Sequence, residues 1–123
     1  TELLNVHLGL FERERNRQLS KLIDYVLYNL PEKAPLILAG DFNDWRLTAH
    51  KTLVKELKLS EAFESIYGAP ARTFAAALPL LHMDRIYYRG LTVASANVVS
   101  SHNWRWLSDH SALIASLSGD NYA

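Results

Sequence analysis

An apolar segment that ends in a polar loop constrains the fold of this chain more than any other feature. Segment 35–39 reads Pro-Leu-Ile-Leu-Ala, and segment 40–44, directly after it, reads Gly-Asp-Phe-Asn-Asp. A short apolar run between Pro and Gly is typical of a strand that is covered on both faces. In open α/β sheets, ligands bind where such strands end. Asp41 and Asn43, which are separated by one residue, therefore predict two neighbouring oxygen ligands at a sheet edge.

An Asx turn is the alternative interpretation of this loop, because Asp and Asn are common turn formers. Taken alone, segment 40–44 favours neither the turn nor the site. Hard oxygen donors suit a divalent cation such as Mg²⁺, which keeps several waters and takes one or two carboxylates together with substrate phosphate oxygens. The choice between turn and metal site therefore depends on the rest of the chain.

The opening of the chain predicts a parallel strand, helix and strand unit. Residues 3–8 alternate between apolar and more polar types, which indicates a strand with His7 on its polar side. From about residue 12 to residue 30, apolar residues recur at spacings of three and four, which indicates an amphipathic helix that Pro31 stops. A second strand at 35–39 completes a unit that is most simply right-handed and parallel.

A second helical region is expected after the polar loop. Thr48 is the expected N-cap of a helix that buries Leu53, Val54 and Leu57. Ser60 is the expected cap of a further short helical turn. Both helices would cover the same sheet as the first one.

Three more strands complete the expected sheet. Residues 82–88 are joined through Arg89 and Gly90 to residues 91–99, which predicts an antiparallel hairpin. Residues 111–117 predict the final strand. The sequence therefore predicts an α/β fold in which a mixed five-stranded sheet carries two or three helices on one face.

Composition excludes several classes of protein. Thirteen basic residues balance thirteen acidic ones, so the chain lacks the basic field of a dedicated nucleic-acid binder. There is no cysteine, which excludes disulfides and zinc–thiolate sites. No apolar run approaches the roughly 20 residues of a membrane span. A soluble, cytoplasmic protein is the default expectation.

Polar clusters stand beside strand-like segments at four places in the sequence. Besides the loop after residue 39, they are segments 5–8, 84–87 and 108–110. Recurrence at four strand edges favours a site over an isolated turn. In chain order, the candidate residues are His7, Asp41, Asn43, Asp84, Asp109 and His110.

This order of motifs resembles the endonuclease/exonuclease/phosphatase superfamily. These metal-dependent phosphodiesterases include pancreatic-type deoxyribonuclease, abasic-site endonucleases, inositol-polyphosphate phosphatases and neutral sphingomyelinases. Supporting similarities are segment 15–19 at the start of a helix, segment 44–46 after the central motif, and Thr73-Phe74 ahead of the Asp84 strand. The resemblance runs from about Leu3 to Leu117, nearly the whole chain.

The resemblance covers only the C-terminal half of the family's domain. Residues 1–123 are therefore expected to be that half, without the N-terminal half that supplies an asparagine and a metal-binding glutamate. This implies half of a four-layer, deoxyribonuclease-like α/β sandwich with one sheet face left bare. The missing half, or a second copy in a homodimer, is expected to cover that face. The alternative is a catalytically incomplete fragment that folds by self-association or by docking onto a partner.

The resemblance also implies a metal site for Mg²⁺ or Mn²⁺. Asp41 would fix the metal or its water, and Asn43 would hold a phosphate oxygen or the metal. Asp109 resembles the family's second carboxylate on the metal side. The expected metal ligands are thus Asp41, Asn43 and Asp109.

Three other residues resemble the family's proton-transfer and phosphate-binding groups. His110 matches the imidazole that activates water or protonates the phosphoryl oxygen. Asp84 matches the carboxylate that orients this imidazole, with an ion pair to Arg89 as its alternative. His7 matches a histidine that contacts or protonates the transferred phosphate. His50 has no partner pattern and is assigned no role.

The implied activity is metal-dependent hydrolysis of a phosphodiester or phosphomonoester. The family uses one constellation of residues on nucleic acids, inositol phosphates and phospholipids, so the fold does not choose the substrate. The balanced charge argues mildly against long nucleic acid.

Overall fold

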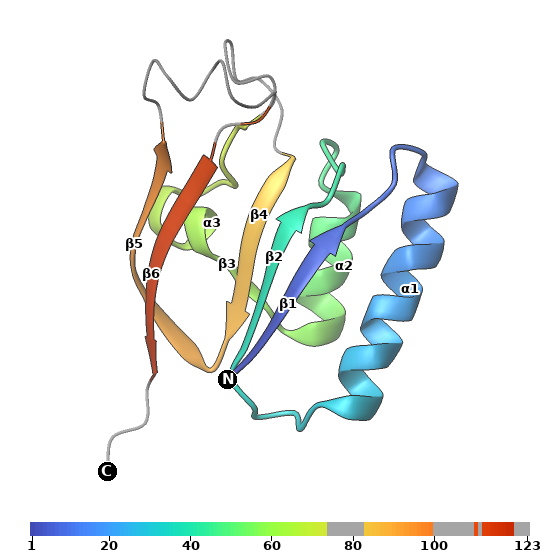
Figure 1. Cartoon of the computed structure of the whole chain (residues 1–123), viewed down its shortest axis with the longest axis horizontal. Helices are drawn as coiled ribbons and strands as arrows, with labels where there is room; N and C mark the ends of the chain where they lie inside the picture. Colours follow the sequence, from blue (N-terminus) through green and yellow to red (C-terminus); the bar gives the residue numbers. More distant parts are fainter. Residues whose placement is uncertain (74–82, 100–109, 111, 120–123) are drawn as a thin grey trace.

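The computed structural model describes residues 1–73, 83–99, 110 and 112–119, which form two sheets and three helices (Figure 1). Strands β1 (Glu2–His7), β2 (Leu36–Asp41), β4 (Asp84–Arg89) and β3 (Ser60–Glu61) make a four-stranded sheet in the order β1-β2-β4-β3. Strands β5 (Leu91–Val99) and β6 (Ala112–Gly119) make a separate two-stranded sheet.

The expected parallel opening unit is confirmed. β1 pairs with β2 in parallel, and helix α1 (Glu12–Asn29) connects them. Helix α1 and helix α2 (Thr48–Leu57) cover one face of the four-stranded sheet (Figure 1). Apolar residues of β1, β2, β4, α1, α2 and the adjoining loops form one core there, namely Val6, Leu8, Leu19, Val26, Leu36, Leu38, Phe42, Ala49, Leu53, Leu57, Leu59 and Tyr87.

The expected five-stranded sheet with a hairpin between residues 82–88 and 91–99 is wrong. β4 pairs with β2 and with β3, whereas β5 pairs with β6 along nearly its whole length. The two-residue strand β3 occupies β4 opposite Tyr87 and Tyr88, beside the turn at Gly90. The edge that a hairpin would need is therefore already taken. His82 and Ser111, where two strands were expected to begin, lie outside the described residues.

The caps of the two later helices also differ from expectation. Helix α2 begins at Thr48, but the cap position is Leu47, and the carboxylate of Asp44 accepts the His50 N–H. Helix α3 (Ala62–Tyr67) is capped by Glu61, whose carboxylate accepts the Glu64 N–H. Carboxylates, not the hydroxyls of Thr48 and Ser60, thus satisfy the free N–H groups of these helices.

Helix α3 belongs to a second core on the other side of β4. Ala62, Phe63 and Tyr88 pack there with Ala96 of β5 and with partly buried residues of β5 and β6. Within the described residues, no helix has the length and apolar character that crossing a bilayer requires.

Candidate functional site

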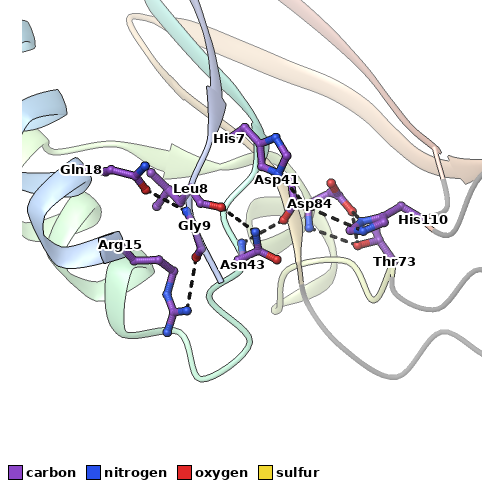
Figure 2. A network of polar contacts seen from close by, with 10 residues as sticks. All are labelled: His7, Leu8, Gly9, Arg15, Gln18, Asp41, Asn43, Thr73, Asp84 and His110. Atoms are coloured by element: carbon purple, nitrogen blue, oxygen red, sulfur yellow. Dashed lines mark hydrogen bonds and ion pairs between the residues drawn. The ribbon is translucent and has the colours of Figure 1, made fainter. Parts of the chain in front are cut away.

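The strand register brings three candidate residues into one row. His7 is paired with Asp41 across β1 and β2, and Asp41 is paired with Asp84 across β2 and β4. Each stands at an end of its strand, so the row forms one edge of the sheet (Figure 2). Since successive residues of a strand alternate between faces, burial of Val6 and Arg85 in the helix-covered side leaves His7 and Asp84 on the opposite side.

Gly40 allows β2 to reach this row. Its φ is +146°, and a Cβ atom added there would lie 1.8 Å from the carbonyl oxygen of Val6. Only glycine fits so close to β1 with this backbone conformation. The residue before Asp41 is therefore fixed by the packing of the strand and not by chemistry.

His110, Asp84 and Thr73 form a short hydrogen-bonded chain. His110 Nδ1 lies 2.5 Å from Asp84 Oδ2, and the Thr73 hydroxyl donates to the same oxygen at 2.6 Å. The backbone N–H of Asp84 donates in turn to Thr73 Oγ1. Because an ionised carboxylate can only accept, Nδ1 is the donor, and a neutral imidazole then has its acceptor at Nε2.

Asp41 faces both histidines. Its Oδ2 lies 3.7 Å from His110 Nε2 and 3.8 Å from His7 Nε2, both beyond normal hydrogen-bond length. Burial raises the pKa of Asp41; the hydrogen bond from the Asn43 N–H lowers it, and the neighbouring Asp84 raises it. Half-burial beside a second carboxylate makes this a place where a positive charge is stabilising.

Asn43 closes the loop after β2. Its N–H donates to Asp41 Oδ1 at 2.9 Å, and its Nδ2 donates to the Leu8 carbonyl at 2.6 Å. The first bond is the Asx turn, so the turn and the cluster of candidate residues coexist in one loop. The φ of +46° at Asn43 is a left-handed conformation that asparagine tolerates better than most residues.

The loop that follows His7 is braced by helix α1 (Figure 2). Gln18 Oε1 accepts the Gly9 N–H at 2.8 Å, and Arg15 Nη1 donates to the Gly9 carbonyl at 3.4 Å. Among the candidates that the structure describes, His7 is the most exposed, with 79% of its side chain accessible. It therefore stands at the rim of the row.

Three of the described candidates are close enough to share a metal ion. Asp41, Asp84 and His110 each offer one ligand atom, and these atoms lie within 4.8 Å of one another. Two carboxylates and one imidazole supply a donor set and a negative charge that fit a divalent cation. Asn43, an expected ligand, adjoins this group through Asp41, and Asp109 lies outside the described residues.

A hollow of about 260 Å³ adjoins the row on the side of β6. Asp84 borders it together with Ala39, Ile86, Ala112 and Leu113, so its walls are largely apolar. The site thus combines charged groups at the strand ends with an apolar wall beside them.

The buried polar residues on the helix-covered face of the sheet, opposite the site, were not identified from the sequence. His50, to which no role was assigned, is buried between the Tyr87 hydroxyl at 2.9 Å and Glu64 Oε2 at 2.6 Å. For a second missed group, Arg85, the sequence does hold a signal. Residues alternate between the faces of a strand, so a β4 strand that turns Asp84 outward turns Arg85 into the core. A buried arginine requires a buried acidic partner, and here that partner is Asp44.

Sequence comparison places this arrangement among known proteins. A model described as the endonuclease/exonuclease/phosphatase family matches residues 3–110. The protein YbhP of Escherichia coli strain K12 is 43% identical over 112 residues, which are 91% of this chain and 44% of that protein. The chain thus spans less than half the length of this relative.

Solved structures show the same fold. A conserved protein from Enterococcus faecalis V583 superposes with a TM-score of 0.80 at 24% identity, over 96% of this chain and 50% of that one. The human nocturnin catalytic domain, solved with a bound sulfate anion, superposes with a TM-score of 0.70 at 25% identity, over 94% and 45% of the two chains.

Proposed function

This chain belongs to the endonuclease/exonuclease/phosphatase family, and we propose that it forms part of a metal-dependent phosphate-ester hydrolase. The observation that carries the proposal is the chain Thr73–Asp84–His110 directed at Asp41. An imidazole held by a carboxylate at one nitrogen, with its other nitrogen facing a candidate metal ligand, is an arrangement suited to proton transfer during hydrolysis.

In this proposal His110, Asp84 and His7 carry out the proton transfer and the phosphate contacts. His110 Nε2 takes a proton from the attacking water or donates a hydrogen bond to the phosphoryl oxygen. Asp84 fixes the ring orientation and stabilises the positive charge when the imidazole is protonated. His7, at the exposed rim, contacts the departing or incoming phosphate.

Asp41 and the neighbouring donors hold the cation, Mg²⁺ or Mn²⁺. Asn43 and Asp109 complete the ligand set that the sequence suggests, and Asp84 and His110 lie close enough to contribute. When bound, the ion supplies polarisation of the phosphoryl oxygens and stabilisation of the leaving oxygen.

The substrate is a phosphodiester or phosphomonoester of nucleic acid, inositol phosphate or phospholipid. The equal numbers of acidic and basic residues argue against a long nucleic acid as the main partner. We further propose that residues 1–123 are the C-terminal half of the catalytic domain, and that further ligands come from the rest of it. The alternative, a catalytically incomplete fragment that folds by self-association or by docking onto a partner, is not favoured over this function.

Hydrolysis of bis(nitrophenyl) phosphate by the protein as encoded tests this function. Activity should require Mg²⁺ or Mn²⁺ and disappear in excess chelator. His110→Ala should lower kcat on the order of 100-fold or more, whereas Lys21→Ala on the exposed side of α1 should leave it unchanged. Undiminished hydrolysis in chelator, or by the His110 variant, would contradict the proposal.

A further inference from the structure

A buried ion pair lies directly behind the row of site residues. Arg85 Nη1 donates to Asp44 Oδ2 at 2.8 Å, and Nη2 donates to the carbonyl oxygen of the same residue. The two side chains are 0% and 3% exposed. A buried ion pair is weak evidence for stability, because apolar residues of equal volume often stabilise a core as well or better. Its position therefore suggests another use.

The pair joins the two segments that carry the site carboxylates. Arg85 follows Asp84 on β4, and Asp44 lies three residues after Asp41 on the loop that leaves β2. The same two segments are joined by the backbone bond from the Phe42 N–H to the Met83 carbonyl. The ion pair adds a side-chain connection on the opposite face of the sheet from the site.

Repulsion between the two site carboxylates acts to separate these two segments. Asp41 and Asp84 stand directly opposite each other in the register, and like charges directly opposite across two strands are destabilising. β2 ends at Asp41, and beyond this residue the bond from the Phe42 N–H to the Met83 carbonyl is the backbone connection between the two described segments. A side-chain connection between the two segments would therefore add to the backbone restraint on the separation of the two carboxylates.

We propose that Arg85 is a positioning residue, which acts with Asp44 as a clamp that sets the separation of Asp41 from Asp84. This inference rests on the proposed function. The clamp is itself held, because Asp44 Oδ2 also accepts the His50 N–H and the Tyr87 hydroxyl contacts Arg85 Nη1 at 3.1 Å. It thereby anchors the site loop to both β4 and helix α2.

The chain contains a matched control at the other end of β4. Arg89 Nε donates to the Ala34 carbonyl at 3.3 Å, and its Nη2 donates to the Pro31 carbonyl at 3.1 Å. Arg89 thus ties β4 to the loop before β2, as Arg85 ties it to the loop after β2. Arg89 is less buried than Arg85 and bonds to carbonyls instead of a carboxylate, and it lies at the end of β4 away from the site.

The test compares Arg85→Lys with Arg89→Lys in the protein as encoded. A lysine keeps the charge but replaces the planar, two-nitrogen contact with a single ammonium group, so it does not reproduce the geometry of the pair with Asp44. Arg85→Lys should lower kcat about 10-fold or more with KM little changed, since small displacements of catalytic groups are costly. It should also weaken Mn²⁺ binding, measured by electron paramagnetic resonance, about 10-fold. Arg89→Lys should leave both within about twofold of wild type.

Loss of stability is controlled by Val26→Ala, which removes buried volume from α1 outside the site. If Val26→Ala and Arg85→Lys lower the unfolding midpoint equally, only the latter should lose Mn²⁺ affinity. Asp44→Asn should reproduce the Arg85→Lys effects, and the double variant should be no worse than the poorer single one.

Three outcomes overturn the clamp. The first is a folded Arg85→Lys protein with wild-type kcat and Mn²⁺ affinity. The second is a Val26→Ala protein that, at equal stability, loses as much kcat and Mn²⁺ affinity as Arg85→Lys does. The third is failure of both Arg85→Lys and Asp44→Asn to fold. If the wild-type protein binds Mn²⁺ but hydrolyses no phosphate ester, the proposed function fails. In that case the Mn²⁺ measurements still decide the clamp.

Discussion

A single carboxylate oxygen connects the two sides of the site at the residue scale. Asp84 Oδ2 receives the Thr73 hydroxyl at 2.6 Å and lies 2.5 Å from His110 Nδ1. Thr73 is fully buried, so its hydroxyl has no solvent to turn to. The orientation of the imidazole therefore depends on a side chain that touches no substrate.

Thr73→Val should lower kcat about 10-fold, as is typical when a group that supports a ligand or catalytic residue is lost. Valine keeps the shape of threonine but leaves the Asp84 N–H and one carboxylate bond without a partner. Thr73→Ser retains the hydroxyl and should recover most of the activity. Steady-state kinetics of the two variants provide the measurement, and equal kcat values would remove Thr73 from this role.

The stability of the metal-free protein should depend on the charge of Asp41. Its pKa in the fold is raised above 3.8, so the folded state binds this proton more tightly than the unfolded state does. Stability from this group is consequently present at low pH and is lost as pH rises through the window above 3.8. Asp41→Asn, which stays neutral, should melt at a higher temperature than wild type at pH 7 in chelator.

That advantage should vanish near pH 3, where Asp41 is protonated in both states. Thermal melts across the pH range in chelator measure it. The prediction would be contradicted if the melting temperature of Asp41→Asn, relative to that of wild type, were lower at pH 7 than at pH 3.

How far the site could be predicted follows from the residues themselves. The place of Asp41 could be predicted, because this residue directly follows the expected strand 35–39. His7 and Asp84 were expected inside strands 3–8 and 82–88, and their position at strand ends comes from the structure. The Thr73 contact depends on the path of a loop, which has no periodicity to read. The pairing of Arg85 with Asp44 spans 41 residues, and no local pattern specifies such a partner.

At the scale of elements, the close approach of β2 to β1 restricts the sequence at one position. It needs a residue without a side chain at position 40, directly before the candidate ligand. Gly40→Ala should therefore destabilise the protein by about 3 kcal/mol or more, through both strain and overlap with Val6.

Gly68→Ala is the matched control for this substitution. Gly68 has a φ of +90°, but a Cβ atom there would meet nothing within 4 Å. Its substitution should cost only the backbone penalty, about 1–2 kcal/mol. Urea denaturation distinguishes the two, and equal losses would show that the contact with Val6 relaxes freely.

The elements that could be predicted are those whose signal is local. Alternation predicts β1, the helical spacing and Pro31 predict α1, and the short apolar run predicts β2. The helical crossover predicts that the two strands pair in parallel. The predicted hairpin was wrong because β3 pairs with β4 in its place. β3 contains only two residues, Ser60 and Glu61, which are too few to show a period in the sequence. The caps failed because a carboxylate three to six residues before the accepted N–H replaced the expected hydroxyl.

For the molecule as a whole, metal binding and folding should be coupled. A ligand that binds only the folded state at about 100 times its Kd adds about 2.7 kcal/mol to stability. Mg²⁺ or Mn²⁺ should accordingly raise the melting temperature of the protein as encoded, and Asp41→Asn should abolish the increase. Differential scanning calorimetry with and without metal measures it, and an unchanged wild-type melting temperature would argue against the site.

The neighbouring residues Asp84 and Arg85 carry opposite charges on opposite faces of β4. A slip of one residue in the pairing of this strand would exchange those faces. The guanidinium would then enter the carboxylate row, and the Asp84 carboxylate would face the Asp44 carboxylate inside the core. Both errors are costly, so the opposite charges of Asp84 and Arg85 disfavour a one-residue slip in the pairing of β4.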